Sequence, residues 1–411
     1  MRSFVRPFRD PAQIWCARCL IVVAAVLVSQ PLMGTGASAD SSNQGSVKSG
    51  SGRILRVGPG QTLKRVAEAA RVARDGDTVE IEAGDYEGDV ASWAQNDLTL
   101  RAVGGRARLD AHGAASEGKA IWVIKGSGVV VEGIDFTHAR VPDRNGAGIR
   151  HEGASLTVRN CRFIDNEDGI LTSNNNVSEL TIENSEFGRN GAGDGRSHNL
   201  YVGQIRRLTV IGSYFHHARV GHLLKSRAAR NDVMYNRLTD EAGGSASYEL
   251  EFPAGGLAYV IGNIIEQSPQ TENTTIISYG AEGYPWPQNE LYLINNTIVD
   301  DRAQQGTFLH VAAGTARVVA INNLLLGRGM LDAAGPGKYV NNVVADESDV
   351  ASRSRYDYHL KKRAQLVGKA ANPGNANGVK LRPEREYVHP MRTRPLSRAA
   401  LSPGALQTVA P

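Results

Sequence analysis

A motif of about 26 residues repeats across the middle of the chain, and no other feature constrains the fold as strongly. Each copy has a short run of alternating apolar residues, then a small or amide residue at a turn, then a bulky apolar residue three positions on. The copies are residues 156–166, 180–190, 208–218, 232–241, 259–268, 291–301 and 317–327. The turn residues are Gly133, Asn160, Asn184, Gly212, Tyr235, Gly262, Asn295, Asn322 and Asn341. A repeat of this length is typical of a solenoid.

The period and the strand pattern predict an all-β fold, a right-handed parallel β-helix in which each repeat forms one coil of three short strands. Coils stack about 4.8 Å apart, so that equivalent residues form columns along the axis. Asparagines in such a column can bond the amides of their neighbours. Leucine-rich repeats require a stricter spacing of Leu and Asn, and propellers require four strands per roughly 40 residues. The sequence has neither pattern.

Both ends of the repeat region agree with this fold. Residues 60–89 predict an amphipathic helix, a Gly-Asp turn and then the first strand, and the helix would cap the exposed strand edges at the end of the coil. This stretch resembles the N-terminal segment of the pectate-lyase-like β-helix superfamily. Residues 357–371, 383–390 and 402–406 resemble the C-terminal segment of that superfamily. The resemblance implies the fold only, because the scaffold hosts lyases, hydrolases, epimerases and inert adhesins.

The N-terminus predicts export. Four arginines precede the apolar run 20–32, and Ala37-Ser38-Ala39 follows as a small-residue cleavage site, which is the pattern of a signal peptide. An uncleaved membrane anchor is the alternative. We predict a signal peptide at 1–39, a flexible Ser/Gly-rich spacer at 40–53, the β-helix at 54–350 and a C-terminal segment and tail at 351–411. The predicted location is secreted or periplasmic, without membrane attachment after cleavage.

Charge and cysteine content exclude several partners and sites. The chain has a formal net charge of +4, of which residues 1–39 contribute +3 (four arginines and one aspartate), so that +1 remains after cleavage. This balance gives no reason to expect a nucleic-acid partner. Cys16 and Cys19 lie in the predicted signal peptide, which leaves Cys161 without a disulfide partner or a cysteine-based zinc site. We expect a monomer.

Three successive coils carry a dense set of polar side chains, in residues 198–204, 221–227 and 247–253. Leu200, Leu223 and Leu250 each lie 12 residues before a turn residue, namely Gly212, Tyr235 and Gly262. We expect these three leucines to fill the interior. Because side chains alternate along a strand, their neighbours should face outward. The expected outer columns are Asn199, His222 and Glu249, then Tyr201, Leu224 and Glu251, with Lys225, Arg227, His198 and Tyr248 at their borders.

This surface predicts an enzyme that acts on an acidic polysaccharide. In β-elimination a base removes the proton next to a uronate carboxylate, a cation neutralises the growing charge and an acid protonates the leaving oxygen. Lys225, His222, Tyr201 and Arg227 offer these groups. In hydrolysis two carboxylates flank the bond, and Glu249 and Glu251 would lie about 6.6 Å apart on one strand.

The candidate residues fall into two groups. The candidate catalytic residues are Lys225, His222, Tyr201, Glu249 and Glu251. The candidate substrate-binding residues are His198, Asn199, Arg227, Tyr248 and Trp286, the last in an aromatic-rich loop at 278–290.

The Lys225-Ser226 pair, followed by Asn231 and Asn236, is similar to a stretch of the alginate lyase and chondroitinase B type. This resemblance implies that Lys225 is the base, and it raises calcium, held by an Asn/Glu/Glu set, as a cofactor. The chain departs from the pattern, because it lacks an arginine on the next coil and its Glu-x-Glu pair follows the lysine. We therefore expect His222 to take the second proton-transfer role and Arg227 to bind a substrate carboxylate.

Three other functions remain open from the sequence: a glycoside hydrolase, a uronate C5-epimerase and a non-catalytic glycan-binding β-helix. The concentration of polar groups on three coils favours an enzyme, because an adhesin would spread its contacts along many coils.

Overall fold

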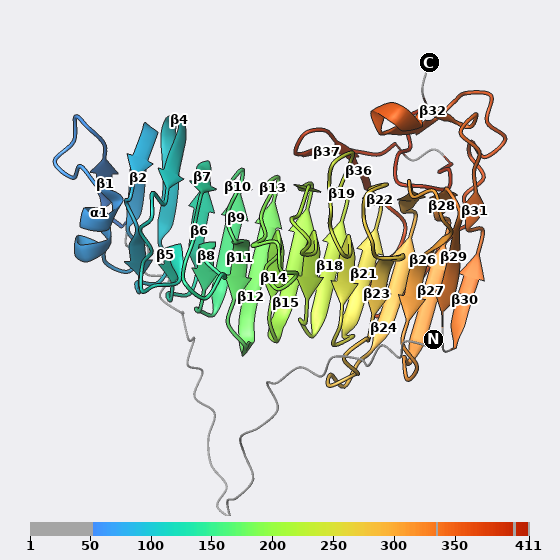
Figure 1. Cartoon of the computed structure of the whole chain (residues 1–411), viewed down its shortest axis with the longest axis horizontal. Coiled ribbons are helices and arrows are strands. Elements are labelled where there is room, and N and C mark those ends of the chain that lie inside the picture. The colour runs from blue at the N-terminus through green and yellow to red at the C-terminus, as the bar shows by residue number, and fades with distance from the viewer. Residues whose placement is uncertain (1–51, 334–335, 398–399, 410–411) are drawn as a thin grey trace, which may run out of the picture. The chain divides into compact units, whose positions relative to one another are not determined.

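The computed structural model describes residues 52–333, 336–397 and 400–409. The predicted signal peptide and most of the spacer lie outside these residues. The described part is an all-β parallel solenoid of about ten turns, with one α-helix near its N-terminal end (Figure 1). This confirms the predicted fold class. Within the described ranges, none of the helices is long and apolar enough to cross a membrane.

Three parallel sheets run along the coil. The first sheet contains β3 (Ala91–Trp93), β5 (Ala120–Ile124), β8 (Ala147–His151), β11 (Asp168–Thr172), β14 (Leu200–Val202), β17 (Leu224–Ser226), β20 (Leu250–Phe252), β23 (Thr275–Tyr279), β26 (Gly306–Val311) and β29 (Gly329–Ala333). The second sheet contains β6 (Val129–Glu132), β9 (Ser155–Arg159), β12 (Asn175–Glu183), β15 (Ile205–Ile211), β18 (Arg230–Met234), β21 (Leu257–Ile261), β24 (Glu290–Ile294), β27 (Arg317–Ile321) and β30 (Gly337–Val340).

The third sheet contains β7 (Ile134–Thr137), β10 (Arg162–Ile164), β13 (Glu186–Gly188), β16 (Tyr214–His216), β19 (Arg237–Thr239), β22 (Ile264–Gln267), β25 (Thr297–Asp300), β28 (Leu324–Leu326) and β31 (Val343–Val344). The long strands β2 (Thr78–Glu87) and β4 (Thr99–Asp110) join the second and third sheets at the N-terminal end, where β1 (Ile54–Val57) pairs with β2.

A single left-handed residue makes the turn between the second and third sheets in each coil. It is the turn residue that the repeat predicts, with φ between 48° at Asn184 and 75° at Gly133. Gly and Asn tolerate this conformation best, which accounts for their recurrence. The main asparagine ladder lies one residue further on: the Oδ1 atoms of Asn263, Asn296 and Asn323 each accept a hydrogen bond at 2.9 Å from the backbone amide of the preceding asparagine in the ladder.

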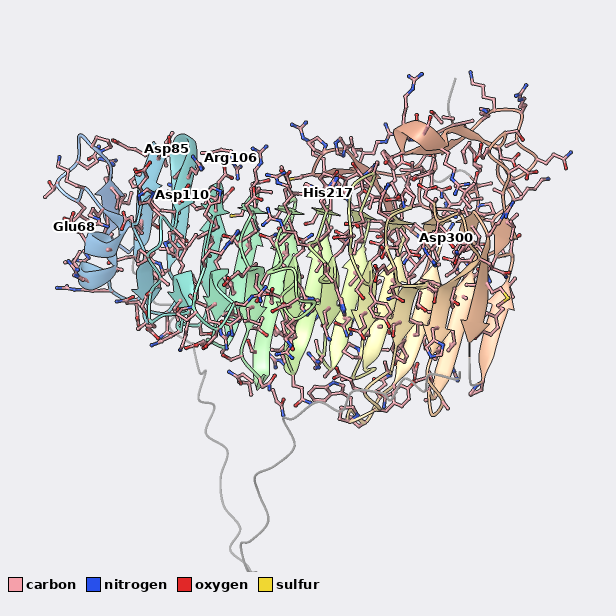
Figure 2. The ribbon with its side chains drawn as sticks, viewed as in Figure 1. Glu68, Asp85, Arg106, Asp110, His217 and Asp300 are labelled. Atoms are coloured by element: carbon pink, nitrogen blue, oxygen red, sulfur yellow. The ribbon has the colours of Figure 1, made fainter. Side chains whose placement is uncertain are left out.

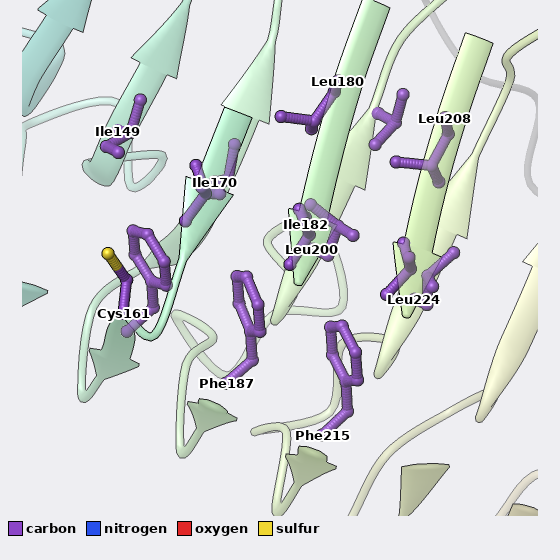
Figure 3. Packing of buried hydrophobic residues seen from close by; sticks show 14 of the residues in the cluster. Ile149, Cys161, Ile170, Leu180, Ile182, Phe187, Leu200, Leu208, Phe215 and Leu224 are labelled. Carbon is purple, nitrogen blue, oxygen red and sulfur yellow. The ribbon is translucent and has the colours of Figure 1, made fainter. Parts of the chain in front are cut away.

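The interior is filled by columns of apolar side chains. Phe136, Phe163, Phe187 and Phe215 stack with ring centroids 5.0, 4.7 and 4.6 Å apart, close to the strand spacing that sets their separation. Figure 3 shows Phe187 and Phe215 in this column, with inward side chains from the first sheet that include Leu200 and Leu224. The columns hold the coils in register, and each sheet therefore presents a fixed series of outward side chains.

Helix α1 (Val66–Val72) covers the N-terminal end of the coil and buries Val66 and Ala69. It is shorter than the apolar pattern suggests. The Asp89 carboxylate accepts hydrogen bonds from the amides of Val66 (2.6 Å) and Ala67 (2.9 Å), which satisfies two of the free N–H groups at the start of the helix.

The C-terminal segment returns over the third sheet. It contains β32 (Val350–Ser352), the 3₁₀ helix η1 (Arg353–Arg355), β33 (Asp357–Leu360), β34 (Asn375–Ala376), β35 (Val379–Lys380), β36 (Arg385–Val388) and β37 (Arg392–Pro395). Figure 1 shows β36 and β37 above the coil near β19 and β22. His217 follows strand β16, and Asp300 is the last residue of strand β25. Both lie along the same edge of the coil in Figure 2.

Candidate active site

The outward column of the first sheet differs by one residue from the predicted column. Tyr201 pairs with Lys225, and Lys225 with Glu251, while Leu224 lies in register with Leu250 in the interior. The alignment of Leu223 with Leu200 and Leu250 was therefore wrong. The physical reason is corner length, because Leu224 precedes its turn residue by 11 positions, whereas Leu200 and Leu250 precede theirs by 12. Lys225, and not Leu224, faces outward.

Asn199 and Glu249 do not face outward, which corrects the second part of the prediction. Strands β14 and β20 begin one residue later, so both side chains belong to the corner, where strand alternation does not apply. Asn199 is fully buried and its amide donates to the backbone oxygen of His216 at 2.9 Å. Glu249 is also fully buried, with Oε2 3.4 Å from Gln267 Nε2. Glu249 and Glu251 therefore do not form the carboxylate pair predicted for hydrolysis.

Three rings form a column along one border of this surface. The ring of His222 lies between those of His198 and Tyr248, with centroids 4.4 and 5.0 Å away. The backbone amide of His222 donates to His198 Nδ1 at 2.9 Å, which places the His198 proton on Nε2. Burial lowers the pKa of His198 well below its usual value. His198 also packs edge-on against Tyr201, at 4.8 Å between centroids.

Glu251 connects His222 to Lys225. Its Oε2 atom lies 3.0 Å from His222 Nδ1 and 3.3 Å from Lys225 Nζ, and the side chains of Glu251, His222 and Lys225 are only 7%, 7% and 15% exposed. Burial acts to raise the pKa of Glu251, but its contacts with His222 and Lys225 outweigh burial and lower the pKa, so Glu251 is ionised at neutral pH. Burial lowers the pKa of His222, which keeps its imidazole neutral.

Arg227 binds Tyr201 and a carboxylate that sequence reasoning missed. Its Nη1 atom donates to the Tyr201 hydroxyl at 2.9 Å, and its Nε and Nη2 atoms donate to Glu282 at 2.7 and 2.6 Å. Burial acts to lower the pKa of Arg227, but Glu282 and Tyr201 outweigh it and raise the pKa, so this cation is permanent. Glu282 lies in the aromatic-rich loop at 278–290. The sequence analysis selected this loop for its aromatic residues and did not consider its carboxylate.

Trp286 anchors that loop. Its indole Nε1 donates to the backbone oxygen of Arg227 at 3.0 Å, and the side chain is partly buried. Trp286 therefore holds the loop against Arg227, the residue that follows strand β17. Its contact with substrate stays a prediction.

A polar groove of about 520 Å³ adjoins Tyr201 and Arg227 on the first sheet. Arg150 lies in the same outward column as Leu171 and Tyr201, and sequence reasoning missed it although it stands in a regular strand. The other lining side chains that could bind hydroxyl groups are Asn145, Thr172, Ser173, Asn174 and Gln204. Arg150 and Arg227 line the groove from its first and last coils, and none of its lining residues is a carboxylate, although Arg227 is paired with Glu282 outside the lining.

The residues present do not fit the calcium set that the resemblance implies. Glu249 lies inside the coil, and the Glu251 carboxylate already contacts Lys225 and His222. Among the described residues, no three His, Cys, Asp or Glu side chains are arranged to hold a metal ion. We therefore derive no catalytic step that involves calcium.

Comparison with known proteins identifies the architecture. The family model for a right-handed beta helix region matches residues 100–238. The solved structure of pectate lyase Pel9A superposes with a TM-score of 0.58 at 14% identity, over 86% of this chain and 96% of that chain. A rhamnogalacturonan lyase superposes with a TM-score of 0.44 at 11% identity, over 83% and 97%. A search of curated proteins found no match.

These findings and the three-sheet coil define a right-handed parallel β-helix protein. Its fold is similar to that of pectate lyase Pel9A, which agrees with the β-helix that the sequence predicted.

Proposed function

We propose that this protein is an exported lyase that cleaves an acidic, uronate-containing polysaccharide by β-elimination, in the periplasm or outside the cell. One observation carries the proposal: Tyr201, His222, Lys225, Arg227 and Glu251 form a single cluster beside the groove, in which Lys225 Nζ lies 5.9 Å from the centre of the Tyr201 ring. The name of pectate lyase Pel9A points to the same class of substrate. At 14% identity that likeness supports the fold, so the reaction is argued from the cluster.

The cluster offers two cations for the substrate carboxylate. As the base removes the proton at C5, the carboxylate gains charge that must be neutralised. The sequence predicted Lys225 as that base, but its Nζ atom lies 3.3 Å from the ionised Glu251 carboxylate. In the proposed mechanism Lys225 and Arg227 therefore neutralise the carboxylate.

His222 is then the proposed base and Tyr201 the proposed acid. His222 is neutral, and its Nδ1 atom lies 3.0 Å from Glu251 Oε2. In the proposed mechanism Nδ1 carries the proton, and Nε2 holds the free electron pair that takes the C5 proton. The electrons of the C–H bond form the C4=C5 double bond as the C4–O bond breaks. Tyr201 gives its proton to the leaving oxygen, and the hydrogen bond from Arg227 stabilises the phenolate that results.

The experiment is incubation of the purified protein with polygalacturonate, alginate and chondroitin. Ultraviolet absorbance of the unsaturated uronate and the number of new reducing ends are measured. We expect both to rise together on one substrate. His222→Ala, Lys225→Ala and Tyr201→Phe should each lower kcat/KM by about 100-fold or more.

The matched controls are Lys362→Ala and Tyr339→Phe, two exposed side chains outside the cluster, which should retain full activity. Reducing ends without absorbance would establish hydrolysis, and inverted C5 centres without cleavage would establish epimerisation. Binding without either reaction would establish a glycan-binding protein. Each of these results overturns the lyase proposal.

A further inference from the structure

A second pocket, of about 510 Å³, lies on the third sheet beneath the C-terminal segment. Tyr214, Arg237 and Glu241 line it from the coil, and Tyr356, His359 and His389 line it from the C-terminal segment. None of its lining residues belongs to the first sheet or to the cluster around Lys225. Its volume is within the usual range for a pocket that holds a small ligand.

The coil side of this pocket is a rigid wall of rings and paired charges. The Arg237 guanidinium lies 5.8 Å from the centre of the Tyr214 ring and 5.7 Å from the centre of the Tyr356 ring. Its Nη2 atom is 3.1 Å from Glu241 Oε1, and the Tyr214 hydroxyl donates to the same oxygen at 2.8 Å. Arg237 and Glu241 neutralise each other, so the wall offers aromatic surface and no net charge.

The C-terminal side supplies polar groups that remain available. His359 Nδ1 lies 2.5 Å from Asp357 Oδ1, which places its proton there and leaves Nε2 as an acceptor. The Tyr387 hydroxyl donates to the backbone oxygen of Pro390 and lies 3.3 Å from His389 Nδ1, so His389 donates from Nδ1 and its Nε2 is likewise an acceptor. Within the described ranges, neither Nε2 atom has a hydrogen-bond partner.

Arg355, on η1, supplies the charge. It lines the pocket, is exposed, and has no hydrogen bond or ion pair with any described residue. A free guanidinium binds a carboxylate through two parallel hydrogen bonds. Imidazole acceptors suit sugar hydroxyl groups, and aromatic surface suits the apolar face of a sugar ring. One ligand class uses all three features.

We propose that this pocket is a second carbohydrate site, which binds a carboxylated sugar unit through Arg355, His359 and the Tyr356 ring. The site would hold a polysaccharide chain away from the first sheet, and its assignment does not depend on the proposed lyase activity.

The test is isothermal titration of the full chain with galacturonate and mannuronate trisaccharides, with cellotriose as the uncharged probe. Arg227→Ala supplies a background in which the first sheet is impaired. In that background we expect a carboxylated trisaccharide to bind, and Arg355→Ala and Tyr356→Ala each to weaken its binding about tenfold or more. Arg363→Ala, an exposed arginine of the same segment that does not line the pocket, is the matched control and should bind normally.

Thermal unfolding of each variant separates loss of binding from loss of folding, and Arg355→Lys, which keeps the charge, should retain part of the affinity if the fold is intact. Equal affinity for cellotriose would overturn the proposed ligand class. Unchanged binding in Arg355→Ala and Tyr356→Ala, or no binding of either carboxylated probe in the Arg227→Ala background, would overturn the site. Because these outcomes concern the third sheet, they are distinct from failure of the lyase assay.

Discussion

At the scale of single residues, Glu251 fixes the positions of two proposed catalytic side chains. One carboxylate oxygen contacts both His222 Nδ1 and Lys225 Nζ in a nearly dry environment. Its negative charge favours protonation of His222, and burial of the imidazole opposes protonation more strongly. In the proposed mechanism Glu251 is therefore a positioning residue that also raises the pKa of the proposed base, His222.

Replacement of this carboxylate tests its role through pH. Glu251→Gln removes a charge that raises the pKa of His222, so that pKa should fall further. Since the proposed base is active only when neutral, the acidic limb of the kcat/KM profile should move to lower pH, while kcat/KM at its optimum should fall by about tenfold or more.

Glu282→Gln is the comparison, because Glu282 contacts Arg227 and not His222. It should leave the acidic limb in place even if activity falls. An unchanged limb in Glu251→Gln would show that His222 is not the base.

The sequence analysis identified the residues of this cluster as site residues, but it predicted the side-chain direction correctly for only some of the candidates. Tyr201 and Glu251 stand inside strands, where alternation correctly predicts an outward direction. Asn199 and Glu249 precede the strands, where no periodic rule applies, and they turned inward. Arg150 lines the groove from a regular strand of another coil, where alternation also applies, but it lies outside the three coils on which the prediction rested. Glu282 reaches Arg227 from a loop, where no periodic rule applies.

At the scale of elements, two neighbouring positions define the turn between the second and third sheets. The first has a left-handed backbone, and the second carries the asparagine ladder. The repeat located the left-handed residue correctly in every coil from Gly133 to Asn341. The interior ladder follows one position later, because the residue after the turn is the one whose side chain points into the coil. Composition alone could not separate these two positions, since both are rich in asparagine.

The ladder predicts a specific loss of stability. The Asn263 side chain accepts hydrogen bonds from Asn236 N (2.9 Å) and Asn236 Nδ2 (3.1 Å) and donates to Val233 O (2.9 Å). Asn263→Ala leaves these buried groups without partners, and we expect the free energy of unfolding to fall by about 2–4 kcal/mol.

Urea unfolding measures this change. Asn375→Ala, at an exposed asparagine outside the ladder, should cost less than about 0.5 kcal/mol. Equal effects at the two positions would contradict a stabilising role for the ladder.

At the scale of the whole molecule, buried carboxyl groups collect in the third sheet and in the connections that lead from it to the first sheet. Asp240, Glu249 and Glu266 belong to this set, and each has a pKa raised chiefly by burial. The pKa of Asp240 rises from 3.8 to about 7. Such groups are protonated in the fold at pH values where they are ionised in the unfolded chain, so they stabilise the fold less as pH rises.

This arrangement predicts that stability falls between mildly acidic and neutral pH. The Asp240 contribution is fully present below pH 3.8 and is lost progressively up to about pH 7. Between pH 5 and pH 7.5 this group alone should lower the free energy of unfolding by about 2–3 kcal/mol.

Asp240→Asn should remove that part of the pH dependence, whatever its effect on stability at a single pH. Asp85→Asn, at an exposed carboxylate, is the control and should leave the slope unchanged. Denaturant unfolding at the two pH values measures both slopes, and equal slopes in Asp240→Asn and the wild type would refute the assignment.

Lys225 is five residues before Arg230, whereas the residues paired with these two in the neighbouring coils, Tyr201 and Arg207 or Glu251 and Leu257, are six apart. This corner between the first and second sheets is therefore one residue shorter in register, which brings Lys225 to the surface of the coil. Deletion of one residue at such a corner shifts one strand by one position relative to its turn residue. The corresponding strands of the coils on either side keep their positions. A β-helix can therefore acquire a new surface charge through a change in length, without any substitution in the strand that carries it. Searches for related sites should accordingly align each strand separately and allow gaps at the corners.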